Sequence, residues 1–268
     1  MEYITRYLIL ATLLMGGSVL TACGDGDSGE GTVTVEIWGE AFIEEGIPAS
    51  ALADGWAVTY DTFVVVVGAI TAAGADFSAV AAYDLTQPGP HAVASGPAAS
   101  GAIDPVGYAL VPAEGATTNA NVDMALFDAM VANGWSVYVS GHASRDGSTI
   151  TFAWGFDVAV DYVDCHAADT VPTGGTGTTQ LTIHGDHLLY ESLVDHDASL
   201  RFGPLADADA NADGEVTPAE LAAVSGIAFG ALDHYDVGAG SGIDNLWDYL
   251  VAQVETIGHI DGEGHCDF

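Results

Sequence analysis

The chain has 268 residues, and with 38 Asp or Glu against 3 Lys or Arg its formal net charge at pH 7 is −35. A field of this sign repels phosphates and anionic headgroups, which argues against binding of nucleic acid or lipid headgroups and favours cations as partners. The 49% hydrophobic content excludes an acidic disordered chain and predicts a folded core. Adaptation to a salty environment, where charge repulsion is screened, is an alternative reason for the acidity.

The N-terminal segment has the pattern of an export signal. Arg6 precedes an apolar run over residues 7–14, and Cys23 follows that run. The run is shorter than the ~20 residues that a membrane-spanning helix needs. We therefore expect residues 1–22 to be a cleaved signal peptide rather than a retained membrane helix.

The four residues Leu20-Thr21-Ala22-Cys23 resemble the lipobox of bacterial lipoproteins, in which the cysteine is acylated and becomes the first residue of the mature chain. The resemblance implies an exported protein that is anchored to a lipid bilayer through Cys23. Gly24 after the cysteine, in place of Asp, implies the outer membrane, on its periplasmic or cell-surface side. Residues 23–31 are rich in Gly, Asp and Ser, as expected of a flexible tether.

Residues 32–185 are predicted to form an antiparallel β-sandwich. One helix is expected within it at residues 122–132, with Asn121 as its N-cap and Asn133-Gly134 at its end. Three strands are expected between segments rich in Gly, Pro, Ala and Ser: 33–38, 57–67 and 180–184.

The clearest strand signal is the alternation from residue 150 to residue 162, where every second side chain is large and apolar. This pattern predicts one long antiparallel strand with a buried face. Residues 135–139 alternate in the same way, starting with Trp135. Between the two runs Asp146-Gly147 is expected to turn a hairpin, because both residue types tolerate positive φ.

Two of the three cysteines remain free to pair once Cys23 carries lipid. Exported proteins reach an oxidising compartment, so we expect a disulfide between Cys165 and Cys266. Closing so long a loop would stabilise the fold by roughly 4 to 5 kcal/mol. The bond would tie the C-terminus to the end of a strand.

Residues 186–268 are predicted to form a small helical region. Apolar residues from Leu189 to Val194 follow Asp186 at helical spacing, and Asp186 is the expected N-cap. A second helix is expected over residues 243–257, where apolar side chains recur on one face.

Within this region, segment 209–220 places oxygen-bearing side chains at alternate positions and ends in a glutamate. Gly214 allows a sharp bend, and Val216 is expected to pack the segment against a neighbour. The pattern is similar to the calcium-binding loop of an EF-hand, and hard oxygen ligands with a bidentate glutamate favour calcium over magnesium. The resemblance implies these ligands: Asp209, Asn211, Asp213, the Glu215 carbonyl, Thr217 directly or through water, and bidentate Glu220.

The surroundings of this loop limit its expected role. Pro204 shortens the helix that enters the loop, which does not favour sensor-like opening and closing. A second, degenerate loop is expected to begin at Asp236. Trp247 stands where its chelating glutamate would be, so it should not bind calcium, although Ile243 could pair with Val216.

Histidines offer an alternative site. His184 and His187 lie where a strand is expected to end and a helix to begin, with Glu191 one helical turn beyond. Imidazole and carboxylate ligands suit zinc or copper. Surface or capping roles are the simpler interpretation, because the spacing is not diagnostic. Further candidate ligands are His142, His166, His259 and His265.

The predicted function is a calcium-binding, membrane-anchored lipoprotein in which the calcium loop stabilises the fold and the β-sandwich acts as a binding or structural module. The alternative is a zinc- or copper-binding protein or metalloenzyme that uses His184 and His187. Catalysis is not expected, since the chain has no Gly-x-Ser-x-Gly elbow. The sequence identifies no protein or glycan partner for the sandwich.

Overall fold

The structure, a computed structural model, describes residues 29–195, 197–226, 235–238 and 241–268. The expected signal peptide and the lipid-carrying Cys23 lie outside these residues, as does most of the tether. Within the described residues no helix has the length and apolar character needed to cross a membrane.

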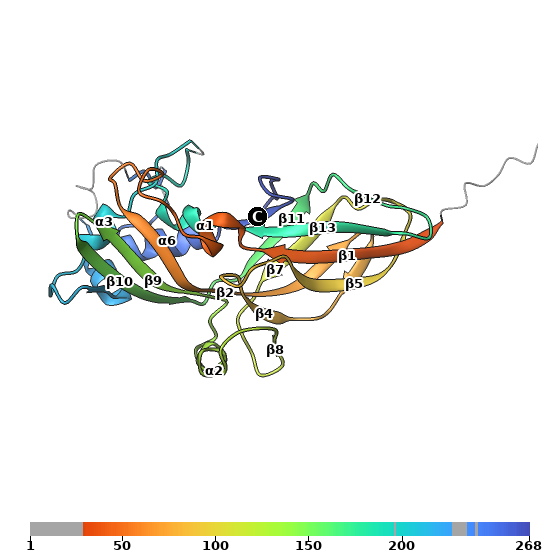
Figure 1. Cartoon of the computed structure of the whole chain (residues 1–268), viewed down its shortest axis with the longest axis horizontal. Coiled ribbons are helices and arrows are strands. Elements are labelled where there is room, and N and C mark those ends of the chain that lie inside the picture. The colour runs from red at the N-terminus through yellow and green to blue at the C-terminus, as the bar shows by residue number, and fades with distance from the viewer. Residues whose placement is uncertain (1–28, 196, 227–234, 239–240) are drawn as a thin grey trace, which may run out of the picture.

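The chain forms two main β-sheets, which confirms the prediction of a mainly β fold. The smaller sheet lies across one half of the larger one (Figure 1), and Val35 of the former and Val65 of the latter belong to the same hydrophobic core. The smaller sheet contains, in spatial order, β15 (Gly258–Ile260), β13 (Thr176–Ile183), β1 (Glu30–Trp38) and β5 (His91–Ala99).

The larger sheet has nine strands and is built around the long strand β2 (Ala57–Ala72). Its main path runs through β11 (Val160–Cys165), β7 (Val106–Leu110), β2, β9 (Val137–Arg145), β10 (Ser148–Phe156) and β14 (Glu215–Val216). Three short strands join it beside this path: β3 (Ala75–Phe77), β4 (Ala81–Asp84) and β8 (Thr118–Asn119). A separate pair is formed by β6 (Gly101–Ala102) and β12 (Thr170–Val171).

The expectation of purely antiparallel pairing is wrong, because both main sheets are mixed. β1 is parallel to β13, from Thr32 opposite Thr176 to Trp38 opposite Thr182. β14 is likewise parallel to β10, and β8 to β4. Parallel neighbours need a long connection, whereas hairpins join antiparallel ones. Most of the described chain lies between β1 and β13, and it supplies that connection.

The middle of β2 is buried on both faces, which explains its unbroken run of valines. Val65 and Val67 face the core between the sheets, whereas Val64 and Val66 face a second hydrophobic cluster on the outer side. That outer face is covered by α2 (Met124–Asn133), which lies on the far side of the large sheet from β1 (Figure 1).

The helix predicted at 122–132 is therefore present, but its N-cap is Asp123 and not Asn121. The Asp123 carboxylate accepts hydrogen bonds from two N–H groups of the first turn at 2.9 and 3.3 Å, whereas Asn121 accepts one from the N–H of Asp84. Gly134 ends the helix in the left-handed conformation, with φ of 67°, as predicted.

The hairpin predicted at Asp146-Gly147 is confirmed. β9 and β10 pair antiparallel, and the two turn residues have φ of 51° and 84°. Trp135 departs from the expected alternation, because it precedes β9 and packs on the outer face of the sheet. Its ring stacks there on Tyr138, with 5.6 Å between ring centroids.

The single strand predicted over 150–162 is wrong, although its alternation is confirmed. Residues 157–159 separate β10 from β11, because the neighbouring strand changes there from β9 to β7. β9 and β7 lie end to end along one edge of β2. Val66 marks the point where they meet, because its N–H donates to the carbonyl of Ser136, just before β9, and its carbonyl accepts from the N–H of Val111, just after β7. Every second side chain from residue 152 onward stays buried across the break.

Among the described residues after residue 185, the helices are short and are separated by irregular segments, which differs from the helical region expected over 186–268. Asp186 is not an N-cap, because it lies inside a 3-10 helix whose N-cap position is His184. The helix expected at 243–257 is shorter at both ends. The short helices among the described residues are α1 (Glu40–Glu44), the 3-10 helix η1 (Gly185–Leu189), α3 (Gly203–Ala206), α4 (Pro218–Ala223) and α6 (Leu246–Val254).

These C-terminal elements cover the half of the large sheet that the small sheet leaves open (Figure 1). Trp247 of α6 stacks on Phe156 of β10, with ring centroids 4.9 Å apart and planes 9° apart. Phe202, just before α3, packs against Phe152, with centroids 5.9 Å apart. The C-terminal residues therefore contribute to the same core as the sheets.

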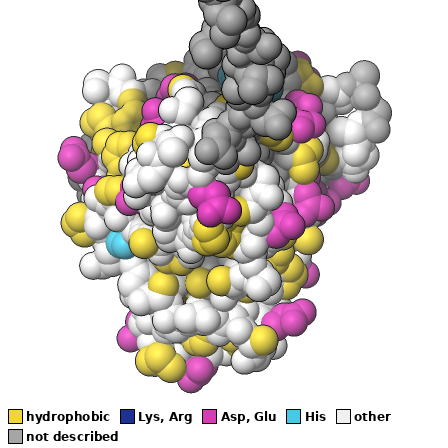
Figure 2. All heavy atoms as spheres, turned by 90° about the vertical axis from the view of Figure 1, so that its right-hand side faces the viewer, with side chains coloured by type: hydrophobic (Ala, Val, Ile, Leu, Met, Phe, Trp, Pro, Cys, Tyr) yellow, Lys and Arg dark blue, Asp and Glu magenta, His cyan; other side chains and the backbone are white. Residues whose placement is uncertain are grey.

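The predicted disulfide between Cys165 and Cys266 is present and joins the end of β11 to the segment that follows β15. The acidic side chains lie mainly on the outside. On the end of the molecule shown in Figure 2 they are scattered among apolar and neutral side chains and do not form one dense patch. The negative field on this end is therefore diffuse.

Candidate metal-binding sites

The predicted calcium loop, residues 209–220, lies between α3 and α4 and reaches the edge of the large sheet. Its middle residues form β14, which pairs with β10. Val216 is fully buried, and its carbonyl accepts a 2.9 Å hydrogen bond from the indole N–H of Trp154. Val216 thus packs the loop against a neighbour as predicted, but its backbone pairs with β10 and not with Ile243.

Three of the predicted calcium ligands are folded into one tight turn. The Asp209 carboxylate accepts hydrogen bonds from the N–H groups of Gly214 and Asp213 at 2.9 and 3.2 Å. Asn211 Oδ1 accepts from the Asp213 N–H at 2.8 Å, and Asp213 Oδ1 accepts from the Glu215 N–H at 2.9 Å. Gly214 makes the predicted bend, with φ of 84°.

The last two predicted ligands, Thr217 and Glu220, form a capping box at the start of α4. One carboxylate oxygen of Glu220 accepts hydrogen bonds from the N–H and the hydroxyl of Thr217 at 3.0 and 2.8 Å. These bonds hold the pKa of the Glu220 carboxyl below its usual value. Glu220 is therefore ionised at neutral pH and positioned at the end of the loop.

A second group of titratable side chains gathers around His184, the residue named in the alternative prediction. His184 directly follows β13, and the next residues form η1, which carries Asp186 and His187. The neighbouring strand β15 carries His259, whose backbone lies opposite Thr182. The sheet thus places side chains from distant parts of the chain at one end of β13.

Four imidazole rings lie close together in this group. The ring centroids of His184 and His259 are 4.3 Å apart, those of His187 and His259 are 5.0 Å apart, and those of His184 and His187 are 5.3 Å apart. His265 lies beside His259, at 5.5 Å, and immediately precedes the disulfide-bonded Cys266.

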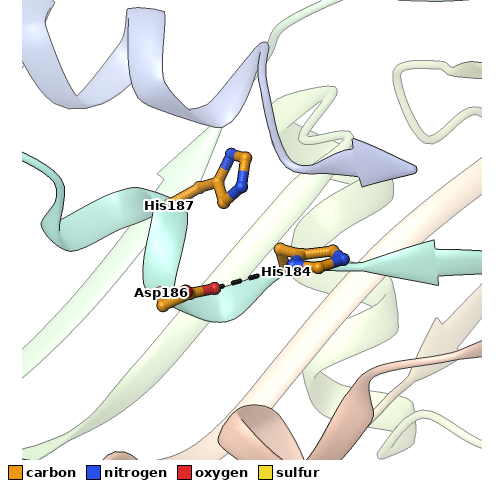
Figure 3. A group of neighbouring side chains, drawn as sticks. All are labelled: His184, Asp186 and His187. Carbon is orange, nitrogen blue, oxygen red and sulfur yellow. Dashed lines mark ion pairs between the residues drawn. The ribbon is translucent and has the colours of Figure 1, made fainter. Parts of the chain in front are cut away.

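Carboxylates approach these rings from two sides. The ligand atoms of His184, Asp186 and His187 lie within 4.8 Å of one another, and so do those of His184, Glu40 and Glu263. Figure 3 shows the Asp186 carboxylate pointing towards His184, with His187 on the same turn. Among the described residues, these are the two sets of at least three such side chains close enough to share a metal ion. The acidic side chains of the loop 209–220 are less closely gathered.

Glu191 is not part of this group, which corrects the alternative prediction. The 3-10 helix ends before Tyr190, which is extended, with ψ of 139°. Glu191 therefore does not lie one helical turn beyond His187, and it forms an ion pair with Arg201 instead.

Two other candidate histidines also lie away from the group. His142 is 3.5 Å from the Asp61 carboxylate, and His166 is 2.9 Å from that of Asp104. Both rings are exposed enough for solvent to screen these pairs.

Burial controls protonation in the group around His184. Burial, together with the nearby His184 and His265, lowers the pKa of His259 to about 4. Burial also raises the pKa of the Asp186 and Glu40 carboxyls, and the attraction of His184 opposes that rise. At neutral pH the His259 ring is uncharged and carries a lone pair.

His259 is only 8% exposed, and within the described part of the chain its Nδ1 has no hydrogen-bond partner. A cavity of about 180 Å³ opens beside it. His187, His259, Glu263 and His265 are among the residues that line the cavity. Ions and small molecules therefore have a path to the imidazole rings.

No family model, curated protein or solved structure matches the chain. The donor atoms of each site indicate which ion it suits. The loop 209–220 offers hard oxygen donors, which suit calcium. The group around His184 offers imidazole nitrogens with carboxylate oxygens, which suit a borderline transition metal.

The sequence interpretation missed Glu40, Asp186 and Glu263 as possible metal ligands. Residues 258–265 contain two histidines, an aspartate and a glutamate within a short run, and this density was a usable signal. Glu40 could not have been found in this way, because only the fold brings α1 next to the end of β13.

Proposed function

We propose that the protein is an exported lipoprotein, anchored to the outer membrane through Cys23, that binds one calcium ion in the loop 209–220. The ion has a structural role, because it holds the loop against β10. The two facing sheets, arranged as a β-sandwich, act as a binding or structural module. The observation that carries the proposal is that the loop itself contributes β14 to the edge of the large sheet.

The loop supplies the hard oxygen atoms that calcium requires. Asp209, Asn211 and Asp213 share one turn, and Glu220 stands at the start of α4. The carboxylates of Asp209, Asp213 and Glu220 repel one another within this short segment when no cation is present. A bound calcium ion would remove that repulsion, so binding favours the folded loop.

Two features support a structural role over a sensor role. The helices on either side of the loop, α3 and α4, have 4 and 6 residues, which is too short to transmit a large change of angle. Moving the loop away from β10 would also expose Val216 and break its hydrogen bond with Trp154. Extracellular calcium modules typically bind the ion with a Kd of ~10⁻⁴ to 10⁻³ M, which external calcium can saturate. The site would then be occupied constantly, as a structural role requires.

Calorimetric titration of calcium into chelator-treated protein tests this proposal. One binding event is expected, and it should be lost in Glu220→Gln but kept in Glu114→Gln, a matched change at an exposed position outside the loop. The melting temperature should rise with calcium, because a ligand that binds only the folded state adds RT ln(1 + [L]/Kd) of stability. Absence of binding at millimolar calcium, or equal binding by the Glu220→Gln variant, would contradict the proposal.

The lipid anchor has a separate test. Cys23→Ser should move the protein from the membrane fraction of cells to the soluble fraction, without affecting calcium binding. An unchanged distribution would show that Cys23 is not the anchor.

A further inference from the structure

We propose that His184, His187 and His259, together with a carboxylate oxygen of Asp186, bind one divalent transition-metal ion of the zinc type. The site is separate from the calcium loop and does not depend on the function proposed above. Three imidazole nitrogens and one carboxylate oxygen make a donor set that zinc accepts in four-coordinate sites.

The first support is the convergence of ligands that are already arranged by regular structure. The ligand atoms of His184, Asp186 and His187 lie within 4.8 Å of one another. In a tetrahedral zinc site with bonds of ~2.0 to 2.1 Å, ligand atoms are about 3.3 Å apart. His259 is not in this set, but its ring centroid lies 4.3 Å from that of His184 and 5.0 Å from that of His187. We expect side-chain rotation to bring the ligand atoms together, because β15 pairs with β13 and η1 follows β13 directly.

The second support is the buried and unpaired nitrogen of His259. Its ring is 8% exposed, its Nδ1 has no hydrogen-bond partner among the residues that the structure describes, and its centroid is 4.3 Å from that of His184. A buried polar atom without a partner is unfavourable and needs an explanation. An ion held between His259 and its two neighbouring rings would use this lone pair.

The third support comes from contacts that orient the rings. His184 Nε2 lies 3.3 Å from the Gly262 carbonyl and 3.7 Å from the Glu40 carboxylate, whereas His184 Nδ1 lies 3.9 Å from Asp186. His187 Nδ1 is 2.8 Å from the hydroxyl of Thr256. Contacts of this kind fix the rings of metal-binding histidines and raise their basicity. They assign Nδ1 of His184 to the ion.

The surroundings give the ion access. The cavity of about 180 Å³ opens onto His187 and His259, and Glu263 and His265 form part of its wall. An ion can therefore enter without unfolding of the sheet. The net charge of −35 raises the local concentration of cations around the protein.

Calorimetric titration of zinc chloride into the chelator-treated protein, in the presence of saturating calcium, tests the site. One zinc ion per chain is expected. The apparent affinity should fall at least tenfold in His187→Gln and in His259→Gln, while calcium binding is kept. The control His142→Gln/His166→Gln removes two histidines outside the group and should retain the wild-type zinc affinity. Equal zinc binding by the site variants and this control would overturn the proposal.

X-ray absorption spectroscopy of the zinc-loaded wild-type protein gives a test that needs no variant. Scattering from imidazole ligands is expected. A shell of oxygen ligands alone, or weak uptake of several zinc ions by surface carboxylates, would overturn the proposal. Glu220→Gln should bind zinc like the wild type, so failure of the zinc site and failure of the calcium site are distinguishable.

Discussion

The disulfide between Cys165 and Cys266 permits a quantitative prediction about how the C-terminal segment is held. Replacing both cysteines by alanine, in a soluble background that also carries Cys23→Ser, opens a covalent loop spanning 101 positions. In the chain-entropy treatment, closing a loop of this length stabilises the fold by about 4.7 kcal/mol at 25 °C. This is a large share of the ~5 to 15 kcal/mol by which domains are usually stable.

Equilibrium unfolding in urea, followed by tryptophan fluorescence at fixed calcium, measures the effect. The double variant should lose about 3 to 5 kcal/mol of unfolding free energy and show a larger dependence on urea, because its unfolded chain is less restricted. Reduction of the background protein with a thiol should reproduce the same curve. A loss below ~1 kcal/mol would refute the chain-entropy reasoning and would mean that packing of β15 and α6 holds the segment without help.

Three further predictions concern single side chains. Trp154→Phe keeps an aromatic ring but removes the indole N–H that donates to the Val216 carbonyl, so it should cost about 1 kcal/mol in urea unfolding and weaken calcium binding. An unchanged calcium affinity in calorimetry would contradict the link between the loop and the sheet. The neutral ring of His259, with a folded pKa of about 4 against about 6.5 when unfolded, contributes stability that is complete above pH 6.5 and lost as the pH falls to 4. The difference in unfolding free energy between metal-free wild type and His259→Gln should therefore shift by roughly 2 to 3 kcal/mol between pH 7 and pH 4, and a constant difference would argue against the lowered pKa. Asp123→Ala removes the N-cap of α2 and should cost about 1 kcal/mol in thermal unfolding, whereas Asp128→Ala, on the exposed face of the same helix, should cost less.

The sequence predicted those features that local chemistry determines. Asp146-Gly147 makes the hairpin because both residues accept positive φ, and the alternation along 150–162 follows from one buried face. The disulfide was predictable from the number of cysteines and the expected compartment, and α2 from its apolar spacing and Gly134. Each of these signals lies within a few residues or depends on composition.

The sequence could not predict which distant strands pair or in which direction, because the local pattern of side chains does not depend on the neighbouring strand. A strand with one buried face has the same alternation of side chains whether its neighbour is parallel or antiparallel. The parallel pairing of β1 with β13 therefore could not be inferred from either segment. The break at residues 157–159 has the same cause, since it marks a change of neighbour and the side-chain period continues through it. Glu191 was misplaced because the spacing assumed an α-helix, whereas the chain becomes extended at Tyr190.

The C-terminal segment also explains why cations would matter in this fold. Its described helices are short, and its points of attachment to the sheets include β14 at the edge of the large sheet, β15 at the edge of the small sheet, and the disulfide at the end of β11. The proposed calcium ion acts at the first point, and the proposed transition-metal ion acts beside the second. In a chain with a net charge of −35, each ion would also neutralise carboxylates that repel one another. Because the two sites share no ligand, their contributions to stability should be additive.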